Sequence, residues 1–268
     1  MEPYSPNSLP EGIRSRFVED VNGLRMHVLE AGDPINPCLP LLHGFPELAY
    51  SWRKVMPALA SAGYYVVAPD QRGYGRTTGW ESGYDADLLP FRFLNLVRDV
   101  LALLHALGHR ETVGIVGHDF GASVAAYCAL ARPDVFPSMT LMSAPFTGAP
   151  VFPFDTMTDI AEAIPEPDIH EAMASLARPR KHYQWYYSTR PANEHMHHCQ
   201  QGVHNFLRAY YHHKSADWPG NEPFRLSSWT ATELEKMPTY YIMDFDKNMA
   251  ETVSPEMPSA TQIVNCLW

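Results

Sequence analysis

The chain has 268 residues, of which 46% are hydrophobic and 12% aromatic, and its net charge is −10. This length and composition fit one large domain, or a core with a smaller inserted domain, and exclude wholesale disorder. The negative charge disfavours nucleic acid and anionic membrane surfaces as partners, because phosphate groups need a basic face.

The cysteines and the N-terminus bear on the cellular compartment. Cys38, Cys128, Cys199 and Cys266 form no Cys-x-x-Cys pair. That pattern is typical of reduced thiols in a cytosolic protein. The N-terminus lacks the basic and apolar regions of a signal peptide, and no apolar run approaches the roughly 18 residues of a transmembrane helix. We therefore expect a soluble cytoplasmic protein with no membrane partner.

The first 145 residues alternate between strand and helix patterns. Asn22-Gly23 is a type I′ turn pair between strand-like runs, so residues 18–28 predict a β-hairpin. Further strands are predicted over 38–42, 64–68, 112–116 and 138–142, and helices over 52–62, 91–107 and 122–130. Continuously apolar strands that alternate with helices are typical of a parallel sheet buried on both faces.

The composition changes after Pro145, where Pro, His, Tyr and Trp become frequent. We predict a core over residues 1–146 and a mostly helical cap over residues 147–268. Helices are predicted over 160–163, 170–176 and 201–211, and loops over 147–157 and 214–228. The run 240–246 fits either a strand or a helix.

Three motifs follow strands in the first half. They are His43-Gly44-Phe45-Pro46-Glu47, Asp70-Gln71-Arg72-Gly73-Tyr74-Gly75 and Gly117-His118-Asp119-Phe120-Gly121. Open α/β sheets bind ligands at the carboxyl ends of their strands. We therefore expect the three motifs to contribute to one site.

The third motif has the Gly-x-nucleophile-x-Gly spacing of a nucleophile elbow, with Asp119 where serine usually stands. Gly117 and Gly121 supply the small residues that so tight a turn needs. A carboxylate attacks an electrophilic sp³ carbon and forms an alkyl-enzyme ester. That chemistry suits an epoxide or a carbon–halogen bond, and it suits a carboxylic ester poorly.

Two further features would support a nucleophilic Asp119. The N-terminus of the following helix favours an ionised carboxylate. The backbone N–H groups of Phe45 and Phe120 are expected to form an oxyanion hole, which would stabilise the charge that develops when the ester is hydrolysed.

Together the motifs resemble the epoxide hydrolase branch of the α/β-hydrolase superfamily. Residues 43–47 followed by Ser51-Trp52-Arg53 favour that branch over the related haloalkane and fluoroacetate dehalogenases. The resemblance covers residues 13–146 closely and reaches more weakly into the cap. It implies an α/β-hydrolase fold, with a mostly parallel sheet, flanking helices and a helical cap. It also implies a hydrolase that opens a small hydrophobic epoxide to a diol through an ester on Asp119, without cofactor or metal.

In that family, two cap tyrosines hydrogen-bond the epoxide oxygen and donate a proton as the ring opens. Tyr186 is the best match for the first tyrosine and Tyr187 is close behind, with a packed aromatic cluster as the alternative interpretation. For the second, the pairs Tyr210-Tyr211 and Tyr240-Tyr241 are weak candidates. The residues expected at the substrate pocket are His43, Pro46, His118 and Tyr187.

The family also needs an acid after its seventh core strand and a histidine after its eighth, which together activate the hydrolytic water. This sequence predicts six core strands, and no Gly-His run follows residue 213, so we expect the last core strands to be missing. Asp244 and Asp246 follow an apolar run and are candidate acids. His204, His212 and His213 are expected to be surface or core residues. His195 and Cys199 stand four residues apart without further ligands, so no metal site is predicted.

Two alternative functions stay open. Without the acid and the histidine, the chain would be a truncated hydrolase-like protein that binds a ligand, or is alkylated once without turnover. A dehalogenase is the other alternative, although Phe120 beside Asp119 offers a halide no side-chain donor. A sheet that ends at its sixth strand exposes an unpaired edge, so we expect poor solubility or homo-oligomers.

Overall fold

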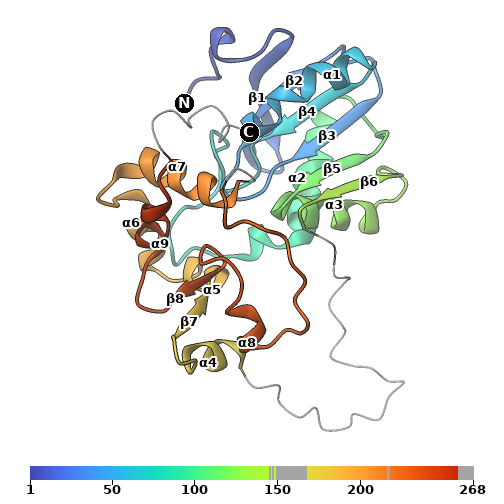
Figure 1. The fold of residues 1–268 in the computed structure, drawn as a ribbon. Coiled ribbons are helices and arrows are strands. Elements are labelled where there is room, and N and C mark those ends of the chain that lie inside the picture. The colour runs from blue at the N-terminus through green and yellow to red at the C-terminus, as the bar shows by residue number, and fades with distance from the viewer. Residues whose placement is uncertain (145, 147, 149–167, 216–217, 259–268) are drawn as a thin grey trace, which may run out of the picture. The chain divides into compact units, whose positions relative to one another are not determined.

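The computed structural model describes residues 1–144, 146, 148, 168–215 and 218–258 (Figure 1). The chain divides into two compact units, Met1–Pro150 and Val151–Trp268. No helix within the described ranges is both long enough and apolar enough to cross a bilayer.

The first unit is built on a six-stranded sheet in the order β1-β2-β4-β3-β5-β6. Its strands are β1 (Ile13–Val21), β2 (Leu24–Ala31), β3 (Cys38–Leu42), β4 (Tyr65–Pro69), β5 (Ile115–His118) and β6 (Met139–Met142). β1 and β4 both pair antiparallel with β2, whereas β4, β3, β5 and β6 run parallel. The predicted mostly parallel sheet is confirmed.

The predicted hairpin is present as β1 and β2. Asn22 and Gly23 have φ values of 52° and 81°, and a type I′ turn requires positive φ at both positions. The hairpin is longer than predicted, because pairing continues to Ile13 opposite Ala31.

Helices α1 (Met56–Ser61), α2 (Phe93–Ala106) and α3 (Phe120–Ala131) accompany the sheet (Figure 1). Short 3-10 turns lie at η1 (Pro6–Ser8), η2 (Ala49–Lys54) and η3 (Leu89–Phe91). The single helix predicted over 52–62 is divided between η2 and α1. Pro57 lacks the N–H that would bond the Arg53 carbonyl, so an α-helix cannot run through this point unbroken.

Buried apolar side chains form two clusters in this unit. In one, the strands pack against α2 and α3 through residues such as Val97, Val100 and Val124. In the other, the strands pack against α1 through Met56 and against η2 through Trp52. The sheet therefore lies between layers of helix, which leaves the loops at its carboxyl edge to carry the chemistry.

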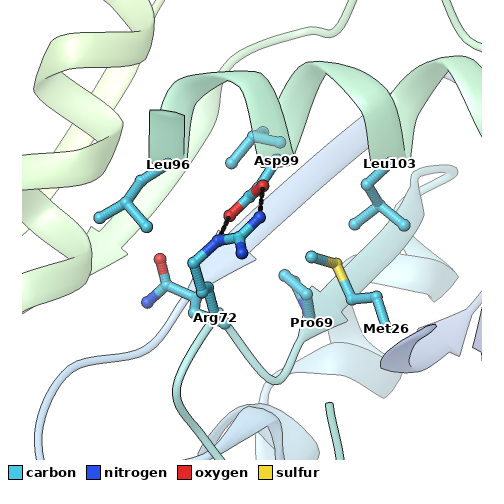
Figure 2. Close-up of a pocket in the computed structure, with 8 residues that line it drawn as sticks. Met26, Pro69, Arg72, Leu96, Asp99 and Leu103 are labelled. Carbon is cyan, nitrogen blue, oxygen red and sulfur yellow. Dashed lines mark hydrogen bonds and ion pairs between the residues drawn. The ribbon is translucent and has the colours of Figure 1, made fainter. Parts of the chain in front are cut away.

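A buried ion pair joins the second motif to α2 (Figure 2). The Arg72 guanidinium donates from Nε to Asp99 Oδ2 at 2.8 Å and from Nη2 to Asp99 Oδ1 at 2.7 Å. Their side chains are 6% and 5% exposed. Arg72 also donates to the Asn22 carbonyl at 3.2 Å. The loop after β4 is thus fixed to α2 and to the hairpin turn.

The second unit is mostly helical in its described residues. It contains α4 (Ile169–Ala174), α5 (Tyr183–Tyr187), α6 (Pro191–His197), α7 (Gly202–Lys214), α8 (Ala231–Leu234), α9 (Met249–Val253) and η4 (Ser254–Glu256). α4 and α7 correspond to two predicted helices. The helix predicted over 160–163 lies outside the described residues, as does almost all of the loop predicted over 147–157.

A two-stranded antiparallel sheet in the second unit was not predicted. It pairs β7 (Arg180–His182) with β8 (Ile242–Asp244). The ambiguous run 240–246 therefore contains a strand. Asp244 ends that strand and forms ion pairs with Arg178, Arg180 and Lys247.

Candidate active site

Asp119 lies in a sharp turn between β5 and α3. Its φ of 52° and ψ of −120° are strained for a residue with a side chain. Its backbone N–H donates to the Met142 carbonyl, and its carbonyl accepts from the Ala122 N–H, both at 3.0 Å. A strained residue between strand and helix is the geometry of a nucleophile elbow.

Three glycines allow the chain to approach itself closely around this turn. A Cβ on Gly117 would lie 2.2 Å from the Gly121 carbonyl oxygen, and one on Gly121 would lie 2.3 Å from the Leu42 carbonyl oxygen. A Cβ on Gly44 would lie 2.3 Å from the Cβ of Asp119. No larger residue fits at these positions without moving the elbow or the loop after β3.

The loop after β3 reaches the Asp119 carboxylate. The Phe45 N–H donates to Asp119 Oδ1 at 3.0 Å. Phe120 is the first residue of α3, where backbone N–H groups have no carbonyl within the helix to bond. The ring of Phe120 packs against Phe93 of α2, at 5.7 Å between centroids. One predicted oxyanion donor therefore already contacts the carboxylate, and the other lies at the helix N-terminus beside it.

His43, which we expected at the substrate pocket, is fully buried. Its Nδ1 lies 2.9 Å from the Gly44 carbonyl oxygen, and its Nε2 accepts from the Gln71 N–H at 3.1 Å. Burial lowers the pKa of His43, so the imidazole is neutral. His43 thus connects the first and second motifs.

Tyr74 is a residue near Asp119 that we did not single out from the sequence. Its ring lies edge-on to His43, with 4.9 Å between centroids. Burial, together with the negative charge of Asp119, raises the pKa of Tyr74 to about 12. The phenol is therefore a protonated hydrogen-bond donor near the carboxylate. Its position in the second sequence motif could have indicated that Tyr74 lies near Asp119.

Glu47, His118 and Ser143 form a hydrogen-bonded row next to the elbow. Glu47 Oε2 lies 2.7 Å from His118 Nδ1, and His118 Nε2 lies 3.0 Å from Ser143 Oγ. The Gly44 N–H also donates to Glu47, at 3.2 Å. Burial would raise the pKa of Glu47, but the bonds from His118 and Gly44 outweigh it, and its pKa is lowered. His118 thus faces an ionised carboxylate.

Tyr186 and Tyr187 lie on α5 in the second unit. Tyr186 is 4% exposed, and its hydroxyl lies 3.2 Å from His195 Nδ1. The Tyr187 hydroxyl donates to the Tyr210 hydroxyl at 3.4 Å. Tyr183, on the same helix, is half-buried, and its hydroxyl accepts from Gln184 Nε2 at 3.3 Å. The structure therefore packs several phenols together around α5.

The other candidates of the second unit have local roles. Asp244 forms ion pairs with the side chains of Arg178, Arg180 and Lys247. His212 and His213 are buried, and His204 is exposed, so the surface-or-core interpretation of these histidines is confirmed. Among the described residues, no group of three or more metal-ligating side chains comes together.

Comparison with known proteins identifies the fold family. Residues 37–223, more than half of the chain, match the family model of the α/β hydrolase fold. Epoxide hydrolase A of Mycobacterium tuberculosis is 45% identical over 136 residues, which are 50% of this chain and 40% of that protein. An epoxide hydrolase of Caballeronia sordidicola is 43% identical over 125 residues, which are 47% of this chain and 36% of that protein. The chain thus spans less than half the length of these two relatives.

Solved structures extend the similarity to both units. An epoxide hydrolase from an endophytic Streptomyces has a TM-score of 0.68 and 30% identity, covering 93% of this chain and 64% of that one. A point mutant of the epoxide hydrolase from Solanum tuberosum has a TM-score of 0.59 and 31% identity, covering 91% of this chain and 72% of that one. The chain therefore belongs to the α/β-hydrolase fold family and is an epoxide hydrolase-like member of it.

Proposed function

We propose that the protein acts on small hydrophobic epoxides through an alkyl-enzyme ester on Asp119. The observation that carries this proposal is the Asp119 carboxylate, held at the strained elbow with the Phe45 N–H bonded to its Oδ1 at 3.0 Å. The similarity to epoxide hydrolases over about half of the chain supports the same chemistry.

The first step is alkylation. A carboxylate oxygen of Asp119 attacks one carbon of the epoxide, the carbon–oxygen bond of the ring breaks, and the released alkoxide takes a proton from an acid. Tyr186 remains the proposed acid from the sequence.

The second step is hydrolysis of the ester. Attack of water on the ester carbonyl places negative charge on an oxygen of Asp119, and the N–H groups of Phe45 and Phe120 would stabilise it. This step also needs a base to take the proton of the water. Alkylation and turnover are therefore separate proposals, and each needs its own measurement.

The two neighbours of the carboxylate favour an epoxide over a halogenated substrate. Phe45 and Phe120 have apolar side chains that cannot donate a hydrogen bond to a departing halide. An epoxide oxygen leaves as an alkoxide that stays attached to the product and needs only a proton. We therefore retain the epoxide and propose no dehalogenase activity.

Single-turnover mass spectrometry tests the proposal. The protein is incubated with a panel of small epoxides such as styrene oxide, and its peptides are then mapped. We expect one adduct, with the mass of the epoxide, on the peptide that contains Asp119. Asp119→Asn should abolish the adduct. Asp20→Asn is the matched control, because Asp20 also has positive φ, at 57°, but lies beside the hairpin turn, and it should alkylate normally.

The absence of both an adduct on Asp119 and diol product with every epoxide in the panel would contradict the proposal. So would an adduct that persists in Asp119→Asn at the same rate. Diol produced well beyond one equivalent of enzyme would establish turnover, and would contradict the alternative of a protein that is alkylated only once.

A further inference from the structure

Glu47, His118 and Ser143 form a hydrogen-bonded row that has no role in the proposed reaction with epoxides. A carboxylate faces one imidazole nitrogen at 2.7 Å, and a hydroxyl faces the other at 3.0 Å. Carboxylate to Nδ1 and Nε2 to serine Oγ is the order of groups that activates a serine nucleophile.

The hydrogen-bond directions follow from the charge on Glu47. The Glu47 carboxylate is ionised and can only accept, so His118 Nδ1 must carry a proton and donate it. In the neutral imidazole, Nε2 then has a lone pair and accepts from the Ser143 hydroxyl. This tautomer is the one in which histidine acts as a general base toward serine.

Ser143 has the backbone and exposure of a reactive residue. It follows the last residue of β6, and its φ of 64° places it in the left-handed region that side-chain-bearing residues seldom adopt. Strained positions of this kind occur mainly at functional sites. Ser143 is also exposed, whereas the carboxylate that orients His118 is buried. The hydroxyl can therefore be reached from solvent, and His118, whose side chain is 23% exposed, lies between it and the buried carboxylate.

A second row in the same unit shows that connectivity alone is not enough. Asp70 Oδ2 lies 2.8 Å from His27 Nδ1, and His27 Nε2 lies 2.9 Å from Ser15 Oγ. There, however, the serine stands within regular β1, and its Oγ also accepts the Tyr4 N–H at 2.8 Å. Both of its partners are fully buried. The Ser15 row is thus a structural counterpart that serves as an internal control.

We propose that Ser143 is a second nucleophile, activated by His118 and Glu47, which is acylated by small carboxylic esters independently of Asp119. This activity goes beyond the proposed reaction with epoxides. Asp119 is suited to sp³ carbon and poorly suited to acyl groups, because acyl transfer to a carboxylate gives a mixed anhydride. A serine hydroxyl gives a stable ester instead.

Acyl transfer to Ser143 needs only the ester, His118 and water. Ser143 Oγ forms a bond to the acyl carbon, and its proton moves to His118 Nε2. The bond between the acyl carbon and the alcohol oxygen breaks, and the alcohol leaves with the proton from His118. Water then repeats the sequence on the acyl-serine, which releases the acid and restores Ser143. With a fluorophosphonate, the Oγ–phosphorus bond forms, fluoride leaves, and the adduct persists.

The test is covalent labelling with a fluorophosphonate, followed by peptide mapping of the full chain. We expect one equivalent of adduct on the peptide that contains Ser143. The adduct should disappear in Ser143→Ala, and labelling should slow by about 100-fold in His118→Gln. Ser15→Ala should label as the wild type does, because Ser15 is the control serine.

Two cross-controls separate this proposal from the epoxide reaction. Asp119→Asn should keep the fluorophosphonate adduct on Ser143, and Ser143→Ala should keep the epoxide adduct on Asp119. The proposal is overturned if Ser143 stays unlabelled in the wild type, if label spreads over several serines, or if His118→Gln labels as fast as the wild type. Labelling of the unsubstituted protein needs no variant to fold, so this test remains decisive.

Discussion

Alanine at position 44 should disable Asp119 without removing any polar group from the site. The added Cβ would lie 2.3 Å from the Asp119 Cβ and 2.5 Å from Asp119 Oδ1. Ordinary contact begins at 3.4 Å, so either the loop or the elbow must move by about 1.1 Å. That displacement also carries the neighbouring Phe45 N–H away from the carboxylate.

The size of the effect follows from this displacement. A misplacement of about 1 Å at a reacting group costs roughly 100-fold in rate, which is equivalent to about 2.7 kcal/mol in the activation free energy. We therefore expect the alkylation rate of Gly44→Ala to fall by about 100-fold. Overpacking should also lower the free energy of unfolding by about 1–3 kcal/mol.

The assay is the rate of epoxide adduct formation on Asp119 in a single turnover, measured together with the melting temperature. Gly83→Ala is the matched control, because a Cβ at Gly83 meets nothing within 4 Å; it should leave both quantities unchanged. The reasoning is refuted if Gly44→Ala folds like the wild type and alkylates within threefold of its rate. Circular dichroism before each assay excludes a variant that has merely unfolded.

Three further predictions concern the ion pair, the cap tyrosines and acid stability. Asp99→Asn should lower the free energy of unfolding in urea by about 3 kcal/mol, because Arg72 stays buried without its partner, and Arg72→Met/Asp99→Leu should recover most of that loss. Tyr186→Phe should slow alkylation of Asp119 by about 100-fold, because the proposed acid then has no proton to give to the opening epoxide; alkylation at the wild-type rate would contradict this assignment. Burial would raise the pKa of Asp70, but bonds from His27 and backbone N–H groups outweigh it and lower the pKa. Its contribution to stability should therefore be present above about pH 4 and be lost as the pH falls further, so Asp70→Asn should flatten the decline seen in urea titrations between pH 5 and 2.

The sequence predicted closely those elements whose structure is set by neighbouring residues in the chain. The strand at Cys38–Leu42 was predicted to the residue, because a short apolar run ends at a glycine-containing turn. The hairpin followed from the positive φ that Asn22 and Gly23 adopt readily. In contrast, β7 and β8 have three residues each and pair across some sixty residues. So short a segment carries no periodic signal, and its pairing depends on tertiary contacts.

The same distinction applies to the site. Asp119 could be proposed from the sequence because an elbow demands small residues at fixed spacing around its central residue. Ser143 could not be found from spacing, because it reaches His118 through the parallel register that sets His118 beside Met142. The placement of His43 also depends on tertiary contacts. A histidine at a strand end can face a cavity or the core. His43 faces the core, where its Nε2 accepts from the Gln71 N–H.

The loop of residues 43–47 couples the two proposed nucleophiles. Its consecutive amides serve different carboxylates, since the Gly44 N–H donates to Glu47 and the Phe45 N–H donates to Asp119. Removing the charge of Glu47 therefore weakens the relay to Ser143 and also loosens the turn that aims Phe45. Glu47→Gln should consequently impair both labelling by fluorophosphonate and alkylation by epoxide, whereas Ser143→Ala should impair only the first. If Glu47→Gln slowed labelling but left alkylation unchanged, the position of the Phe45 N–H would not depend on Glu47. The close glycine contacts of the elbow would then be what positions Asp119.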